Sequence, residues 1–140
     1  MVKRVVMLVL IFSNFLVAAV GFVKTLTGKV ELKKGKKIVM LKVGSSLENG
    51  DVIITKKNSS IGMSFDDGTT ISLGEKATFV INIFKVKPEE NEFDIDVFLK
   101  KGKAVFTSGK IGKLSPKSVK FRIPEGIIGI RGTHFAVEAK

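Results

Sequence analysis

Few side chains in this chain could take part in catalysis or bind a metal ion. It contains one histidine and no cysteine, which excludes a thiol nucleophile, a cysteine metal site and a site built from several histidines. No serine or aspartate stands at a spacing that would complete a catalytic triad with the single imidazole, His134. We therefore predict no catalytic residue and no cofactor, and we place His134 on the surface.

Two pairs of carboxylates could approach a calcium ion. Asp66 and Asp67 are adjacent within a turn sequence, and Asp94 and Asp96 are two residues apart on one face of an expected strand. Calcium sites in proteins use a run of oxygen ligands, and neither pair belongs to such a run. Turn formation explains the first pair and solvent exposure explains the second, so we predict no metal site.

Lysine is the abundant charged residue. The chain has 24 Lys and Arg against 13 Asp and Glu, a formal net charge of +11, and such an excess can neutralise the phosphates of nucleic acid. Arg4, Arg122 and Arg131 are the only arginines, however, whereas base readout favours the bidentate guanidinium. Most phenylalanines fall on alternating positions that a sheet would bury, which removes them as stacking platforms. We therefore predict no nucleic-acid partner.

Two segments share the pattern Leu-Lys-Lys-Gly-Lys, at residues 32–36 and 99–103, and each is expected to form a turn. Lysines at these turns could bind an anionic polymer, discourage edge-to-edge pairing of strands, or form an ordinary solvated surface. The candidate anion-binding surface consists of Lys33, Lys34, Lys36, Lys37, Lys100, Lys101 and Lys103.

The N-terminal segment differs in character from the rest of the chain. Two basic residues precede an uncharged apolar stretch at residues 5–20, which is typical of a secretory signal peptide. We predict cleavage after Ala19, giving a signal peptide of residues 1–19 and one domain of residues 20–140. The alternative is an uncleaved anchor, although this segment of 16 residues is shorter than the roughly 20 residues of a typical membrane span. Either way we expect an exported chain, with membrane contact only through residues 5–20 if they are retained.

Apolar residues alternate with polar ones along most of the remaining chain, which is the periodicity of strands with one buried face. We expect this domain to be all-β, with many short strands in a roll or solenoid-like β-sandwich, preceded by an N-terminal apolar helix in the signal segment. The side chains expected to point inward are Ile61, Met63, Phe65, Ile71, Leu73, Phe79, Ile81, Ile83, Phe93, Ile95, Val97, Leu99, Phe121 and Ile123.

Turn sequences recur about every ten residues. The strongest hairpin signal is Asp67-Gly68, because both residues tolerate the positive φ angles of a tight primed turn. The segment 107–120 is rich in Gly, Ser and Lys and is expected to be a surface loop within the domain.

Three further segments follow one another in an order that carries a resemblance. They are GDVIIT at residues 50–55, FDDGTTISL at residues 65–73 and GIIGIRGTHFAV at residues 126–137. In this order they resemble the FecR domain family, over roughly Val30 to Val137. The pattern I-R-G-T-x-F-x-V in the last segment is the most specific part.

The resemblance implies a periplasmic or extracytoplasmic all-β domain with a role in signal transduction. In the best-known members this domain belongs to a transmembrane regulator that senses an outer-membrane iron–siderophore receptor and controls a cytoplasmic sigma factor. Only Met1 to Arg4 precede the apolar segment here, and the chain stops at Lys140. We therefore expect a stand-alone exported FecR domain without the cytoplasmic anti-sigma part.

The family motif has a structural and a functional interpretation. Arg131 and the backbone amides beside it could hold a carboxylate or phosphate, but an arginine set between apolar residues is better explained as a partly buried charge paired within the domain. We favour the structural interpretation for the whole motif, which comprises Asp67, Gly68, Arg131, Gly132, Thr133 and Phe135.

Two kinds of binding function follow from these observations. The chain is expected to be a non-enzymatic binding or sensory module of the cell envelope that contacts another envelope protein. The alternative is a lysine-rich domain that binds an anionic envelope polymer or ligand. A protein partner would use an apolar patch or an open strand edge, whereas an anionic polymer would use the lysines and dissociate with salt.

Overall fold

The computed structural model describes residues 18–130 and 134–140, and most of these residues lie in strands. The prediction of a mostly β domain is confirmed. The expected signal helix and the motif residues Arg131, Gly132 and Thr133 lie outside the described residues. The strands are β1 (Gly21–Thr27), β2 (Val30–Lys34), β3 (Lys37–Met40), β4 (Ser46–Leu47), β5 (Val52–Thr55), β6 (Ser60–Phe65), β7 (Thr70–Leu73), β8 (Thr78–Lys87), β9 (Glu92–Thr107), β10 (Val119–Ile123), β11 (Gly126–Ile128) and β12 (His134–Ala139).

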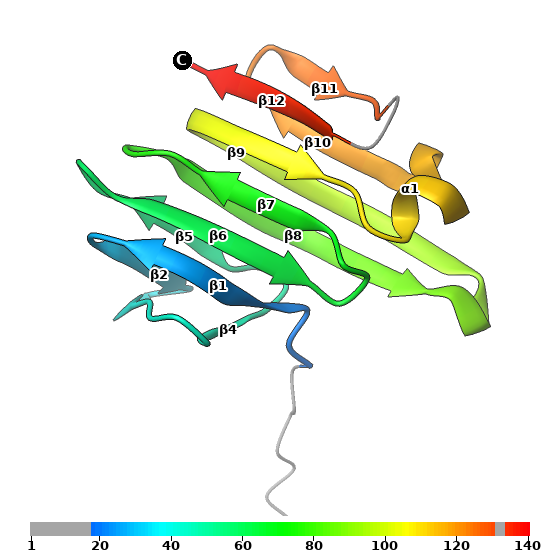
Figure 1. Cartoon of the computed structure of the whole chain (residues 1–140), viewed down its shortest axis with the longest axis horizontal. Helices are drawn as coiled ribbons and strands as arrows, with labels where there is room; N and C mark the ends of the chain where they lie inside the picture. The colour runs from blue at the N-terminus through cyan, green and yellow to red at the C-terminus, as the bar shows by residue number, and fades with distance from the viewer. Residues whose placement is uncertain (1–17, 131–133) are drawn as a thin grey trace, which may run out of the picture.

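The strands form one hydrogen-bonded sheet that curls into two layers (Figure 1). One layer has the order β4-β1-β6-β7-β9-β12 and the other has the order β3-β2-β5-β8-β9-β10-β11. All these pairs are antiparallel except β9 with β10, which is parallel. Both orders contain β9, because its first part pairs with β8 and its last part pairs with β7 and β12.

At one end of the domain the chain passes between the two layers four times, and we call these places the four corners (Figure 1). They are residues 28–29 between β1 and β2, residues 56–59 between β5 and β6, residues 74–77 between β7 and β8, and residues 100–103 within β9. Successive corners belong to neighbouring strands, so the corners lie in a row along this end.

The core lies between the layers and is filled by the side chains that alternate along each strand. In β9, for example, Ile95, Val97 and Leu99 are fully buried, which agrees with the two-residue periodicity of this segment. The prediction for Ile83 is wrong, since this side chain is 40% exposed. A register shift between Ile81 and Ile83 changes the face of β8, and Phe84 is buried in its place.

Two loop predictions also need correction. The turn after β6 is longer than a tight primed turn, because the Phe65 N–H donates to the Thr69 carbonyl and the Gly68 N–H donates to the Phe65 carbonyl. Of the two predicted turn residues, Asp67 and Gly68, only Gly68 has a positive φ, 87°. The segment 107–120 is more than a surface loop, because it contains α1 (Ile111–Leu114) and the 3-10 turn η2 (Pro116–Ser118). Ile111 is fully buried there. A second 3-10 turn, η1 (Pro88–Glu90), joins β8 to β9.

Gly102 allows β9 to bend and so to form part of both layers. Its φ is +101°, and a Cβ at this position would lie 2.6 Å from the Cβ and 2.7 Å from the Cα of Ala77. Only glycine combines this backbone conformation with such close contact. The bend therefore depends on the absence of a side chain at residue 102.

We predict that Gly102→Ala lowers the free energy of unfolding by roughly 2–4 kcal/mol, from backbone strain together with the clash against Ala77. Gly35→Ala is the matched control, because Gly35 also has positive φ, +59°, but faces open space; its cost should be about 1–2 kcal/mol. Urea unfolding monitored by circular dichroism measures both. Equal losses would show that the contact with Ala77 does not constrain the fold.

Candidate functional site

Asp67 fastens the β6–β7 turn to a distant part of the chain. Its carboxylate is buried and accepts hydrogen bonds from the Thr69 N–H at 2.9 Å, the Thr69 hydroxyl at 2.8 Å and the Ile111 N–H at 3.1 Å. Its backbone carbonyl accepts from the Lys110 N–H at 2.9 Å. Three donors satisfy the carboxylate, so Asp67 has no group free for a ligand and acts as a structural clamp.

Gly109 completes the contact between these two segments. Its N–H donates to the Thr69 hydroxyl at 3.1 Å, and a Cβ at residue 109 would lie 2.2 Å from the Asp67 carbonyl oxygen. The turn and the segment before α1 therefore touch backbone to backbone. This contact could not be derived from the local sequence, because the two segments are about 40 residues apart.

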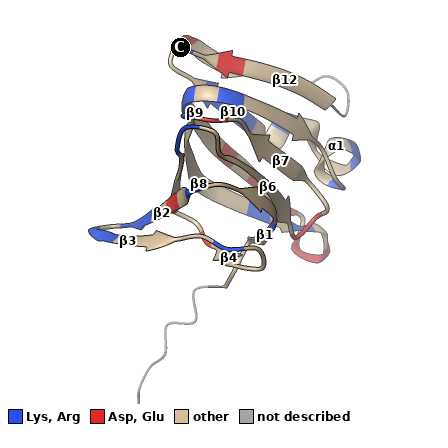
Figure 2. Cartoon of the chain, turned by 60° about the vertical axis from the view of Figure 1, so that its left-hand side comes forward, with Lys and Arg blue, Asp and Glu red and all other residues tan. Residues whose placement is uncertain are grey.

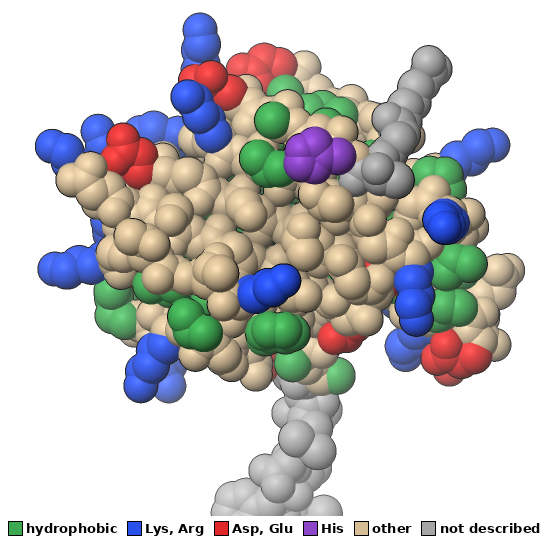
Figure 3. All heavy atoms as spheres, in the orientation of Figure 1, with side chains coloured by type: hydrophobic (Ala, Val, Ile, Leu, Met, Phe, Trp, Pro, Cys, Tyr) green, Lys and Arg blue, Asp and Glu red, His purple; other side chains and the backbone are tan. Residues whose placement is uncertain are grey.

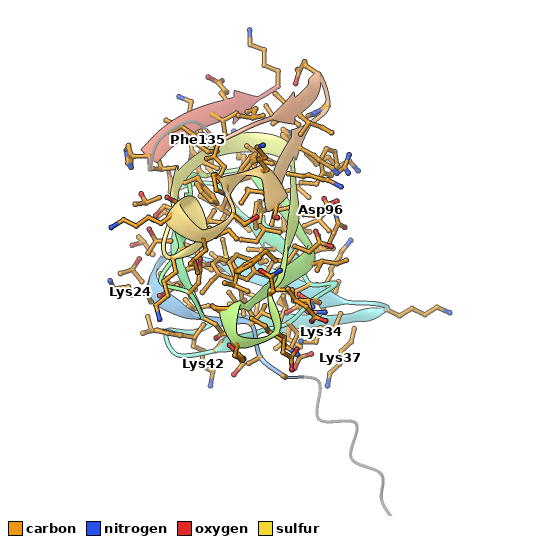
Figure 4. All side chains as sticks on the ribbon, turned by 90° about the vertical axis from the view of Figure 1, so that its right-hand side faces the viewer. Lys24, Lys34, Lys37, Lys42, Asp96 and Phe135 are labelled. Atoms are coloured by element: carbon orange, nitrogen blue, oxygen red, sulfur yellow. The ribbon has the colours of Figure 1, made fainter. Side chains whose placement is uncertain are left out.

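Phe135 belongs to an aromatic cluster in the core. Its ring stacks on Phe106 with centroids 5.1 Å apart and meets Phe121 edge-on at 5.4 Å, and Figure 4 shows it directed inward from β12. Phe135 also lines a hollow of about 770 Å³, whose lining includes Ile128 and Ile130. Among the described residues of this lining only Lys117 is charged.

Asp96 is paired within the domain. The Arg122 guanidinium on β10 donates to both of its carboxylate oxygens, at 2.9 and 3.0 Å, and Asn82 donates a further hydrogen bond at 3.2 Å. The hydrogen bonds from Arg122 hold the pKa of Asp96 below its usual value, despite an opposing effect of burial. The described residues contain no group of three or more acidic or histidine side chains that could hold a metal ion.

His134 lies on the exposed face of β12 next to Phe135. Its Nδ1 is 2.8 Å from the Thr107 hydroxyl on β9. The imidazole thus takes part in a cross-strand hydrogen bond at the edge of the layer.

The structure separates the candidate anion-binding lysines into two groups. Lys33, Lys34, Lys36 and Lys37 lie on the β2–β3 hairpin, whereas Lys100, Lys101 and Lys103 lie at the β9 corner. Strands β5 and β8 stand between the two groups in the sheet, and Figure 2 shows the hairpin projecting away from the body of the domain. The seven lysines therefore do not form one surface.

Lys34 differs from the other lysines of the hairpin because it is paired with two acids. Its ammonium is 2.9 Å from Glu48 and 3.0 Å from Asp51, whose side chain is only 3% exposed. Burial alone would lower the pKa of Lys34, but the hydrogen bonds to Glu48 and Asp51 outweigh it and raise the pKa above its usual value. Lys34 thus fastens the hairpin to the loop before β5 (Figure 4).

Lysines from other parts of the chain lie at the same end of the domain as those of the β9 corner. Lys29, Lys56, Lys57 and Lys76 occupy the other three corners, and Figure 3 shows basic side chains at this end of the molecule as well as elsewhere on its surface. Sequence reasoning missed them because they are far apart along the chain. The only local signal is that each stands in or beside a turn.

The outer edge of β3 is a second surface feature, in addition to the lysines at the four corners. Strand β3 ends the sheet order and pairs only with β2 among the described strands. All four of its residues are exposed, including Ile38 at 56% and Met40 at 49%. This edge combines unpaired backbone with apolar side chains.

Comparison with known proteins gives one family. The FecR protein family matches residues 51–140, which are 90 of the 140 residues. The chain belongs to the FecR family. The family is a regulatory and signalling family associated with the cell envelope. No curated protein and no solved structure gives a significant match.

The family match covers most of the corner lysines but does not reach strand β3. It begins at Asp51 and so includes the corner residues Lys56, Lys57, Lys76 and Lys101, whereas the resemblance seen in the sequence begins earlier, near Val30. Strands β1 to β4 precede the match, so β3 lies outside the part of the chain that the family match covers. Within the described residues no helix has the length and hydropathy needed to cross a membrane.

We predict that Asp67→Ala lowers the free energy of unfolding by roughly 2–4 kcal/mol, because it leaves the N–H groups of Thr69 and Ile111 buried without acceptors. Asp66→Ala is the control: partial burial and the charge of Asp67 raise the pKa of Asp66, so its removal should be neutral or slightly stabilising at neutral pH. Urea unfolding measures both. A loss of similar size in the two variants would contradict the clamp.

We also predict a pH-dependent contribution from the pair Asp96–Arg122. The folded-state pKa of Asp96 is lowered, so the pair stabilises the fold above the ordinary carboxyl pKa, and this contribution disappears as the pH falls through the lowered pKa. The gap in urea midpoint between wild type and Arg122→Gln should therefore be present at about pH 7 and close toward about pH 2. A gap that does not change with pH would assign the effect to packing of the Arg122 side chain.

Proposed function

We propose that this chain is an exported FecR-family signalling module that acts by binding another envelope protein at the open edge of β3. Binding, rather than catalysis, is its function. The observation that carries the proposal is an edge strand whose backbone and side chains are both available to a partner.

The backbone of β3 offers a template for one more strand. The Leu41 N–H donates to the Val30 carbonyl at 2.9 Å, and the register pairs Leu32 with Val39. In an antiparallel ladder hydrogen-bonded and non-hydrogen-bonded pairs alternate, so the N–H and C=O groups of Ile38 and Met40 face away from β2. An extended segment can pair with these groups, as in β-strand addition.

The side chains around this edge are apolar on both faces of the strand, with Ile38 and Met40 on one face and Val39 on the other. Ile38, Val39 and Met40 follow one another on β3, and Val43, 64% exposed, lies just beyond it. Single exposed apolar residues are common on protein surfaces, but a run of them on an unpaired edge is an interaction site or an aggregation hazard. The projection of the hairpin from the domain leaves both faces of β3 accessible (Figure 2).

The charges at the ends of β3 define the partner further. Exposed lysines stand on both sides of the strand, at Lys36, Lys37 and Lys42, whereas Lys34 is neutralised by its acidic neighbours. A segment that is apolar in its middle and acidic at its ends would complement this edge. The partner is therefore an extended apolar stretch with flanking acids, contributed by another envelope protein.

We predict that a photo-crosslinking residue at Val43 captures one discrete partner in the native envelope. Met40→Pro should abolish the product, because proline removes the outward N–H without breaking a bond to β2. Met40→Ala, which keeps that N–H, should retain most of the product. Repeating the capture at low and high salt separates an apolar contact from a purely ionic one.

A crosslinker at Ala136, on exposed β12, provides the positional control. Equal products from Val43 and Ala136, or no effect of Met40→Pro, would contradict the proposal. A product that contains only a second copy of this chain would replace the proposed partner with self-association.

A further inference from the structure

We propose that the row of corner lysines, Lys29, Lys56, Lys57, Lys76 and Lys101, is a binding site for a linear polyanion whose charges are phosphate groups. Its residues differ from those of the β3 edge, although its first corner, at Lys29, lies beside the end of β3, where the Leu41 N–H donates to the Val30 carbonyl. The two proposals are therefore tested with separate variants.

Backbone hydrogen bonds place the corners side by side. The Lys56 N–H donates to the Lys29 carbonyl at 3.1 Å, the Lys76 N–H to the Lys56 carbonyl at 3.4 Å, and the Gly74 N–H to the Lys103 carbonyl at 3.0 Å. Each bond joins one corner to the next. The lysines consequently stand in sequence along one line, although they come from four separate parts of the chain.

Two tight contacts hold this arrangement. The buried Thr55 hydroxyl donates to the Gly74 carbonyl at 2.6 Å and accepts from the Ala77 N–H at 2.8 Å, which fixes the β7–β8 corner against the end of β5. Gly102 packs against Ala77 so closely that no Cβ fits between them, which fixes the β9 corner. The backbones that carry the lysines are thus preorganised, and only the side chains need to be ordered on binding.

A shallow hollow of about 230 Å³ lies at these corners. Four lysines from three corners contribute to its lining, together with small and hydroxyl-bearing residues. Its lining consists of Ile54, Thr55, Lys56, Lys57, Lys76, Ala77, Thr78 and Lys101.

The positive charge at this hollow is only partly balanced. Lys56 lies 3.4 Å from Glu31, while Lys57, Lys76 and Lys101 form no ion pair with any described residue. Glu75 belongs to the same corner, where its carboxylate accepts a hydrogen bond from the Asn58 N–H and offsets one of the positive charges. Like charges held close together repel, and an anion bound among them would relieve that repulsion.

The backbone conformation of Lys76 is an independent indication of a binding site. Its φ is +53°, a left-handed conformation that is unfavourable for lysine and easy for glycine or asparagine. Such strained residues are concentrated at binding and catalytic sites. A lysine at this strained position supplies a charge to the hollow that glycine could not supply.

The geometry favours a linear phosphate chain. Lysine ammonium groups bind phosphate as point charges, and this row contains no arginine fork of the kind that makes planar bidentate contacts with carboxylate or phosphate. Neighbouring strands are about 4.8 Å apart, so four corners span about 14 Å. The lysines follow one line of corners. They therefore fit a linear ligand that carries a charge every few ångströms better than they fit a ligand with an extended flat charged surface.

The test is titration of the full exported domain with medium-chain inorganic polyphosphate, monitored by calorimetry over a range of salt concentrations. The triple variant Lys57→Gln, Lys76→Gln, Lys101→Gln should bind at least about tenfold more weakly. Its slope of log K against log salt should be smaller by roughly 2, because each lysine–phosphate pair contributes about 0.7 to the slope.

The hairpin triple Lys33→Gln, Lys36→Gln, Lys37→Gln is the matched control, because it removes the same charge from another surface. It should weaken binding less than about threefold. If the corner triple proves unstable, the double variant Lys57→Gln, Lys101→Gln should reduce the slope by roughly 1.4. Equal losses in the two triples would attribute binding to net charge and overturn the site.

Two further probes identify the source of the phosphate. Inorganic monophosphate should bind far more weakly than polyphosphate, because it occupies one position of the row. Phosphatidylcholine vesicles containing phosphatidylglycerol should bind more weakly than polyphosphate at equal phosphate concentration. Preferential binding of the vesicles through the corner lysines would replace the linear polyanion with a membrane surface and overturn the proposal.

Discussion

The contact of Gly102 with Ala77 is the constraint on which the domain depends. It allows one strand, β9, to leave the layer that contains β8 and enter the layer that contains β7 and β12. Both layers are therefore built around the same strand, and side chains such as Val97 and Phe106 fill the core from its two parts. The same bend brings the β9 corner against the β7–β8 corner, so one backbone contact organises the core and the basic end of the molecule.

Local sequence predicts the strands because their periodicity is a local property. It places Ile95, Val97 and Leu99 correctly, but fails at Ile83, where a bulge in β8 depends on its pairing with β9. Similarly, Asp67 is recognisable as a turn residue, whereas its hydrogen bond to Ile111 arises only when distant segments meet. Prediction thus succeeds for patterns within a strand and fails for contacts that the topology creates.

The candidate sites show the same division. The two lysine clusters that share a sequence pattern, one around Lys34 and one around Lys101, belong to two separate surfaces. Lysines distant in sequence, such as Lys29, Lys56 and Lys76, are joined by backbone hydrogen bonds at neighbouring corners. The open edge at β3 is also a property of strand order, which alternation alone does not reveal.

A signalling module of this kind needs a rigid body and an accessible contact surface, and we propose that the edge of β3 is this surface. The most direct test is hydrogen exchange over residues 37–42, compared between purified protein and protein in its native envelope. We expect rapid exchange of the Ile38 and Met40 amides in the purified protein and marked slowing in the envelope, because a partner strand would then accept hydrogen bonds from them. Equally rapid exchange in both settings would contradict strand addition at this edge.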